Sequence, residues 1–109
     1  TAKVTVLNHK TAEQTSSGHL YLVRVNGINE EKRNLIIEKM AEAGVACNVH
    51  YKPLPMLTAY KNLGFDIKNY PNAYACYENE ISLPLYSRLT DEQIDYILDN
   101  FIRCVEETV

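Results

Sequence analysis

The spacing of apolar and polar residues divides the amino-terminal part of the chain into two short strands. Residues 3–7, KVTVL, alternate weakly and predict a strand, and the polar run 8–18 predicts a loop or hairpin connection. Residues 19–25, HLYLVRV, are rich in β-branched and aromatic side chains, and the turn signal Asn26-Gly27 follows them, which predicts a second strand. Because apolar residues fall on both faces of this strand, we expect it in the middle of a sheet.

A helix is predicted directly after this turn. Asn29 is a favourable N-cap, and Glu30 and Glu31 lie in the first turn, where the helix dipole favours acidic side chains. Gly44 predicts a left-handed C-cap that ends the helix. The apolar stripe at helical spacing consists of Leu35, Ile36, Met40 and Ala43.

A third strand is predicted over residues 45–51, VACNVHY, and Pro53 and Pro55 end it. One face is expected to carry Val45, Cys47, Val49 and Tyr51, and the other Ala46, Asn48 and His50. A short helix that ends at Gly64 follows, and a second short helix begins near Pro71.

The carboxy-terminal part predicts one more strand and the best-defined helix. Residues 81–86, ISLPLY, contain Pro84, which indicates an edge strand or a strand end. Thr90 and Gln93 make a capping box for the last helix. Its apolar stripe is Ile94, Ile97, Leu98, Phe101, Ile102 and Val105. This order predicts an α+β fold, a two-layer domain with a small, mainly antiparallel sheet and helices packed mostly on one face.

Composition is that of one ordinary globular domain, which we expect to span residues 1–109. The apolar fraction is 46% and the charged fraction 23%. The net charge of -3, without a long run of either sign, argues against nucleic acid or an anionic membrane surface as a partner. No apolar stretch approaches the ~20 residues of a membrane span, and the first residues lack the pattern of a signal peptide. Because the first residue is Thr1, we expect that the chain was cut from a longer protein or processed.

Three widely spaced cysteines, Cys47, Cys76 and Cys104, form no C-x-x-C motif. We expect reduced thiols in a cytoplasmic protein, most of them packed in the core. Neither a disulfide framework nor a zinc site is expected.

His50 and Tyr51 are the candidate binding residues, because they lie where a predicted strand ends. Adjacent strand residues point to opposite faces, so one ring would reach a ligand while the other anchors the loop. Each side chain can form a hydrogen bond with a hydroxyl, a carbonyl or a phosphate. The alternative, which the pattern alone favours, is a structural histidine whose hydrogen bonds are satisfied internally and a tyrosine in the core.

Five tyrosines in the second half of the chain allow two interpretations. They indicate either a platform for sugars, bases or a protein partner, or half-buried rings with hydroxyls in water, which we favour. The five residues are Tyr60, Tyr70, Tyr74, Tyr77 and Tyr86.

The residues predict no complete catalytic apparatus. Lys61, in the sequence KNLG, has nothing nearby that would desolvate it or bind a phosphate, so it is rejected as a Schiff-base lysine. His9 and His19 lack the spacing of metal ligands. The carboxylates are expected at helix starts and on solvent-exposed faces. No Gly-rich phosphate loop and no G-x-S-x-G motif occur.

Several segments, in this order, resemble the carboxy-terminal domain of the DegT-type pyridoxal-phosphate-dependent sugar aminotransferases, which aminate keto groups on nucleotide-linked sugars. These segments are residues 19–25, 44–54 and 70–101. The most specific pieces are His50-Tyr51 followed by Pro53, and ISLPLY leading into LTDEQIDYI. The similarity covers His19 to Phe101, and less clearly residues 1–18.

The resemblance implies the small domain of a fold type I enzyme. In this family the large amino-terminal domain holds the cofactor and its lysine, in a motif followed by a Gly-rich acidic run. Since this chain has no such run, we expect the catalytic large domain to be absent. No catalytic, cofactor-binding or metal-binding residue is expected here, and no cofactor bound to these residues alone. The family's His-Tyr pair faces the nucleotide-sugar pocket, which implies substrate binding by His50 and Tyr51; for the adjacent Lys52, a solvated side chain is favoured over a phosphate contact.

The whole enzyme is then expected to transfer an amino group from an amino acid, usually glutamate, to a keto nucleotide-sugar, and to be a homodimer. This chain would close one wall of the substrate cleft and be inactive alone. A free-standing α+β regulatory module that binds a small molecule is the alternative, and it should begin at its own Met and have its own pocket. A structural interaction domain fits the tyrosine content but leaves the family-like motifs unexplained.

Overall fold

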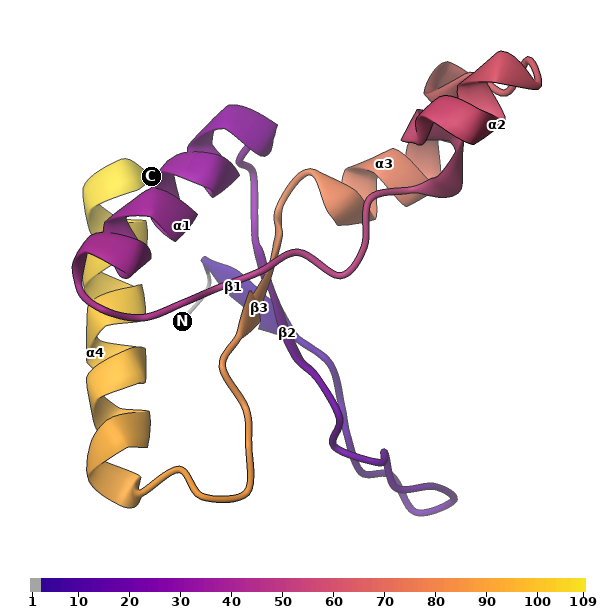
Figure 1. Ribbon diagram of the computed structural model, residues 1–109. Coiled ribbons are helices and arrows are strands. Elements are labelled where there is room, and N and C mark those ends of the chain that lie inside the picture. The colour runs from indigo at the N-terminus through magenta and orange to yellow at the C-terminus, as the bar shows by residue number, and fades with distance from the viewer. Residues whose placement is uncertain (1–2) are drawn as a thin grey trace.

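The computed structural model describes residues 3–109 (Figure 1). Within these residues a three-stranded antiparallel sheet has the order β1-β2-β3. The strands are β1 (Val4–Val6), β2 (Tyr21–Val25) and β3 (Glu80–Leu83). The α-helices are α1 (Glu30–Glu42), α2 (Thr58–Asn62), α3 (Pro71–Tyr77) and α4 (Asp91–Thr108), and short 3-10 helices span Leu54–Met56 and Ile67–Asn69.

The central strand β2 gives the sheet one apolar and one polar face. Val23 lies opposite Val6 on one side and Ile81 on the other, and these positions share the apolar face. Arg24 lies opposite Glu80 on the polar face. The predicted position of residues 19–25 in the middle of the sheet is confirmed, and Pro84 directly follows an edge strand as expected.

Helices α1 and α4 pack side by side on the apolar face of the sheet (Figure 1). Ile36 and Met40 of α1 and Phe101 of α4 belong to the buried core. Both predicted N-caps are confirmed: the Asn29 side chain accepts from a backbone N–H in the first turn of α1, and Thr90 forms the capping box of α4. The predicted α+β class, with a small antiparallel sheet, is also confirmed.

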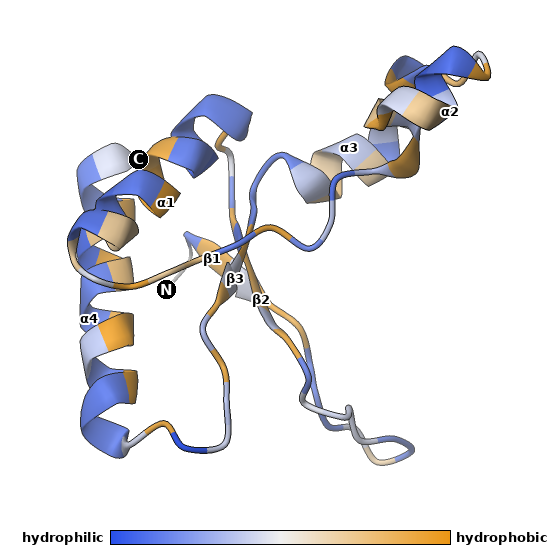
Figure 2. Ribbon diagram, in the orientation of Figure 1, coloured by the Kyte–Doolittle hydropathy of each residue, from blue (hydrophilic) through white to orange (hydrophobic). Residues whose placement is uncertain are grey.

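Residues 54–77 form an arm that projects away from the sheet and from α1 and α4 (Figure 1). The two predicted short helices, α2 and α3, lie in this arm. Helix α2 ends just before Gly64, whose positive φ of 94° favours glycine, and α3 begins at Pro71. Polar and apolar residues are mixed along the arm (Figure 2), and several large apolar side chains are exposed: Leu54, Leu57, Tyr60, Leu63, Phe65 and Tyr70.

The predicted strand over residues 45–51 is wrong in extent. Only Asn48 pairs with the sheet, through two backbone hydrogen bonds of 3.1 and 2.7 Å with Ser82 of β3. Side chains take the next two backbone donors, because the Asn48 amide oxygen accepts from the Val49 N–H and Glu80 accepts from the His50 N–H. The ladder therefore stops after one bridge.

The predicted apolar stripes are only partly buried. Leu35 of α1 and Ile94, Leu98 and Ile102 of α4 are exposed, whereas Arg33 and Cys104 are buried. A sheet of three strands is too narrow to cover the whole stripe of α4. The uncovered part lines a groove of about 370 Å³ beside β1. Among residues 3–109, no helix combines the length and the apolar composition needed to cross a membrane.

The three cysteines have different environments. Cys104 is buried in the core, and the half-buried Cys47 packs against the core cluster. Cys76 on α3 is exposed. The expectation that most of the cysteines pack in the core is therefore confirmed, with Cys76 as the exception. Burial, together with the nearby Cys104 thiol, raises the pKa of Cys47 to about 11, so that it is a poor nucleophile near neutral pH.

Substitutions at two neighbouring residues of α1 test which face of this helix packs in the core. Replacing Ile36, which is fully buried, with alanine is expected to lower the free energy of unfolding by about 2–5 kcal/mol, because a cavity forms between α1 and the sheet. Leu35→Ala is the matched control and is expected to change it by roughly 0.5 kcal/mol or less. Urea unfolding followed by circular dichroism measures both, and equal losses would contradict this packing.

Candidate functional site

The polar face of the sheet borders a hollow of about 320 Å³ that the arm helps to enclose. All three strands contribute to its floor, α3 forms one side, and the segment after the Asn48 bridge forms another. Its polar and aromatic lining residues include Thr5, Arg24, His50, Tyr51, Tyr77 and Glu80. These side chains offer several groups that could bind a polar ligand.

His50 is held in the hollow by hydrogen bonds to β3. Its ring Nδ1 lies 2.7 Å from the Ser82 Oγ, and its backbone N–H donates to the Glu80 Oε2 over 3.2 Å. Within the part of the chain that the structure describes, the other ring nitrogen, Nε2, forms no hydrogen bond. Since Nε2 is not among the buried polar atoms that lack a partner, it is open to water or to a ligand.

Tyr51 lies beside His50 and not on the opposite face. The two rings meet edge-on with their centroids 4.8 Å apart, and both line the same hollow. The Tyr51 side chain is 73% exposed, so the alternative of a core tyrosine is wrong. The expectation of opposite faces is wrong because the regular strand geometry has ended before this point.

Glu80 is a buried acid beside His50 that the sequence did not single out. It is only 6% exposed, and its Oε1 accepts a hydrogen bond of 2.7 Å from the Ser82 Oγ. Burial raises the pKa of Glu80, while the hydrogen bonds from Ser82 and the His50 backbone and the nearby charges of His50 and Arg33 oppose this increase. The expectation that the carboxylates lie at helix starts and on solvent faces is therefore wrong for Glu80. The predicted strand began at Ile81, one residue after Glu80, so the two-residue spacing that places Glu80 and Ser82 on one face of β3 was not recognised.

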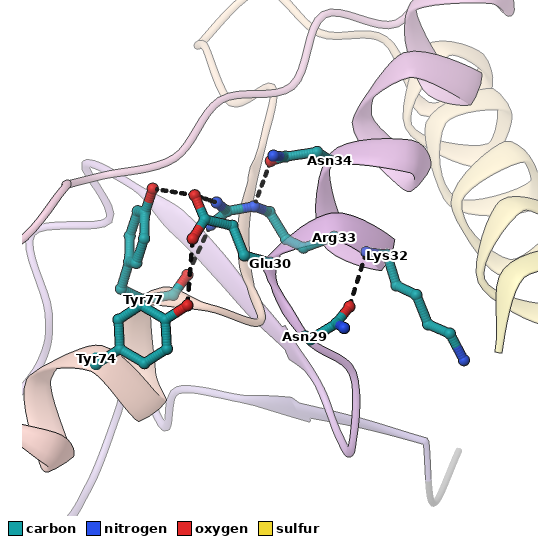
Figure 3. A network of polar contacts seen from close by, with 7 residues as sticks. All are labelled: Asn29, Glu30, Lys32, Arg33, Asn34, Tyr74 and Tyr77. Carbon is teal, nitrogen blue, oxygen red and sulfur yellow. Dashed lines mark hydrogen bonds and ion pairs between the residues drawn. The ribbon is translucent and has the colours of Figure 1, made fainter.

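Two arginines from other elements hold the carboxyl end of α3. Arg33 of α1, which is 2% exposed, donates from Nη1 to the Tyr77 carbonyl over 2.6 Å, and its guanidinium lies 4.6 Å from the centre of the Tyr77 ring (Figure 3). Arg24 of β2 donates to the Ala75 carbonyl over 3.0 Å. Cations near the last carbonyls of a helix are favourable, so these contacts fix α3 beside the hollow.

Glu30 completes this network from the first turn of α1 (Figure 3). Its carboxylate accepts from the hydroxyls of Tyr77 (2.9 Å) and Tyr74 (3.3 Å) and lies 3.5 Å from the Arg33 Nη2. Burial first, and then the negative charge of Glu30, raise the pKa of Tyr74. Tyr74 and Tyr77 are thus half-buried rings that link the arm to α1, whereas Tyr60, Tyr70 and Tyr86 are exposed. The five tyrosines do not form one platform in the described part of the chain.

Arg33 is expected to be the main support of the arm. Arg33→Met removes the charged donor from a buried position and is expected to lower the free energy of unfolding by about 3 kcal/mol. Limited proteolysis is expected to cut the arm earlier in this variant. The control is Arg103→Met on α4, where the side chain is half exposed and the substitution should change little. If both variants unfold at the same urea concentration and are cut at the same rate, Arg33 does not hold the arm.

Comparison with known sequences identifies relatives for most of the chain. The sequence model of the DegT/DnrJ/EryC1/StrS aminotransferase family matches residues 1–102. An uncharacterised protein of Methanocaldococcus jannaschii is 34% identical over 92 residues, which are 82% of this chain and 24% of that protein. The UDP-4-amino-4,6-dideoxy-N-acetyl-β-L-altrosamine transaminase of Helicobacter pylori is 30% identical over 98 residues, 90% of this chain and 26% of that protein. The chain spans about a quarter of the length of these relatives.

A solved structure matches the fold closely. It is a Streptococcus pneumoniae protein described provisionally as a sugar aminotransferase, in its PMP-form. The TM-score is 0.95 at 57% sequence identity, over 98% of this chain and 27% of that protein. The PLP-form of the same protein matches with a TM-score of 0.93. With a family model matched over nearly the whole length and a fold in agreement with it, this chain belongs to the DegT/DnrJ/EryC1/StrS aminotransferase family.

Proposed function

We propose that these residues form one wall of the substrate cleft in a pyridoxal-phosphate-dependent sugar aminotransferase. The enzyme would transfer an amino group from an amino acid, for which we propose glutamate, to a keto nucleotide-sugar. One observation carries the proposal: in a chain of this family, the polar face of the sheet opens into a hollow lined by His50 and the exposed Tyr51. Nearly the whole chain matches a part of larger aminotransferases, which supports this function over a free-standing regulatory module.

We place the cofactor outside these residues. No lysine lines the hollow beside His50, and Lys61 is exposed at the carboxyl end of α2. The described residues therefore do not fit pyridoxal phosphate by themselves. When bound elsewhere in the enzyme, the cofactor supplies the electron sink for amino transfer. This chain would bind and orient the substrate.

His50 and Tyr51 would contact the nucleotide-sugar from the side of the hollow. The Nε2 of His50 has no partner in the described residues, so it can form a hydrogen bond with a sugar group. Tyr51 offers a ring face for an apolar sugar surface and a hydroxyl for a polar one. Lys52 is exposed beside them, and we keep it as a solvated side chain.

We propose that the whole enzyme is a homodimer in the cytoplasm. Large apolar side chains are exposed on the arm and on α4, at Leu63, Phe65, Leu98 and Ile102 among others. Exposed apolar surface of this extent favours burial against other protein surface. The rest of the enzyme or a second subunit would cover it.

His50→Ala in the whole enzyme is expected to raise KM for the keto nucleotide-sugar about tenfold, because a substrate hydrogen bond is lost. The reaction of the cofactor with glutamate, followed by its absorbance spectrum, is expected to stay within about twofold, since the residue would not contact the donor in that half-reaction. Lys52→Ala is the control and is expected to behave as the unmodified enzyme. An unchanged KM in His50→Ala would refute substrate binding by this residue.

The isolated residues 1–109 are expected to transfer no amino group from glutamate, because they lack a lysine placed to hold the cofactor. The assay supplies pyridoxal phosphate, glutamate and a keto nucleotide-sugar, and mass spectrometry detects the aminated sugar. The whole enzyme at the same concentration is the positive control. Aminated product from the purified fragment would show that the cofactor site has been misplaced.

A further inference from the structure

Glu80 accepts two hydrogen bonds while it is almost completely buried. The Ser82 Oγ donates to Oε1 over 2.7 Å, and the His50 backbone N–H donates to Oε2 over 3.2 Å. An ionised carboxyl group accepts at both oxygens, whereas a protonated one donates from one of them. With a donor within reach of each oxygen, the arrangement satisfies Glu80 as a carboxylate.

The single hydroxyl proton of Ser82 then decides the tautomer of His50. Ser82 is 5% exposed, and its side chain lies between Glu80 and the His50 ring. When Glu80 is a carboxylate, Ser82 gives its proton to it, so the Ser82 oxygen can only accept from the His50 Nδ1, which lies 2.7 Å away. Nδ1 then carries a proton. In the neutral imidazole, Nε2 then has a lone pair and no proton.

We propose that Glu80, as a carboxylate, and Ser82 are positioning residues that hold His50 in the Nδ1–H tautomer, so that Nε2 selects a hydrogen-bond donor of the substrate. The group selected would be a sugar hydroxyl or an amide N–H. A phosphate oxygen is not selected, because it is itself an acceptor and has no proton to offer to Nε2. The claim about the substrate depends on the proposed function, whereas the claim about the tautomer does not.

Glu80, Ser82 and His50 form a hydrogen-bonded chain, which we call the relay. The backbone around the relay holds these three side chains in a fixed geometry. Asn48 and Ser82 form two backbone hydrogen bonds, which place the His50 segment against β3 at the level of the relay. Ser82 and Glu80 both lie within β3, so their side chains project from a regular strand and not from a loop. A fixed acceptor at Nε2 distinguishes donors from acceptors better than a ring that is free to rotate.

Glu80→Gln in the holoenzyme tests the relay with almost no change of shape. A glutamine amide has one acceptor oxygen and one donor nitrogen. If the oxygen keeps the His50 N–H, the amide nitrogen faces Ser82, which must then accept from it and donate to Nδ1. The tautomer is expected to invert, which moves the proton to Nε2 and raises KM for the keto nucleotide-sugar about tenfold. Glu38→Gln, at an exposed position of α1, is the matched control and should change neither quantity.

Nitrogen-15 NMR of histidine-labelled holoenzyme reads the tautomer directly, with His50→Gln to assign the signal. A protonated Nδ1 in the unmodified enzyme and a protonated Nε2 in Glu80→Gln would support the proposal. A protonated Nε2 in the unmodified neutral ring, or an unchanged tautomer in Glu80→Gln, would overturn it.

Measurements of KM in Glu80→Gln and His50→Ala distinguish failure of donor selection by Nε2 from failure of substrate binding at this site. If the tautomer inverts and KM does not change, donor selection by Nε2 is wrong; if His50→Ala also leaves KM unchanged, substrate binding at this site fails with it.

Should Glu80→Gln not fold, Ser82→Ala and Ser82→Thr provide a second test of the relay. Alanine removes the acceptor for Nδ1–H and is expected to raise KM. Threonine keeps the hydroxyl and is expected to give the KM of the unmodified enzyme. Equal values of KM in these two variants would overturn the role of the hydroxyl.

Discussion

The pairing of β2 with β3 determines which side chains reach the core and which reach the hollow. In the observed register Val23 lies opposite Ile81, and Arg24 lies opposite Glu80. Because side chains alternate along a strand, the first pair meets α1 and α4 and the second faces away from them. A slip of one residue would turn the charged pair toward the helices and expose the valine and isoleucine to water. Apolar packing on one face therefore also places the polar residues on the other.

Buried polar groups then connect the sheet to the segments around the hollow. Arg33 donates to the Tyr77 carbonyl at the end of α3, and Glu80 and Ser82 of β3 hold His50. A buried charge is costly unless it is hydrogen-bonded, and each of these groups has partners. These contacts fix the lining of the hollow, although part of it comes from the projecting arm and from an irregular segment. In the proposed sugar site, they would present the hydrogen-bonding groups in a defined arrangement.

Local signals in the sequence predicted most of the fold but only part of the site. The N-caps at Asn29 and Thr90 and the apolar strand 19–25 depend on residues close together in the chain, and the structure confirms them. The burial of Arg33 depends on the carbonyl of Tyr77, 44 residues away, and the position of His50 depends on Ser82, 32 residues away. No local pattern contains these contacts. For the same reason the predicted strand over residues 45–51 was too long, since distant and local side chains compete for its backbone donors.

A crystal structure of the whole enzyme with a nucleotide-sugar bound would test the central claim most directly, namely that the polar face of this sheet is a wall of the substrate cleft. The account predicts that the sugar lies against this face, with a hydroxyl or an amide N–H within hydrogen-bonding distance of the His50 Nε2 and with Tyr51 beside it. A sugar bound elsewhere, with His50 and Tyr51 exposed to water or covered by protein, would contradict the account.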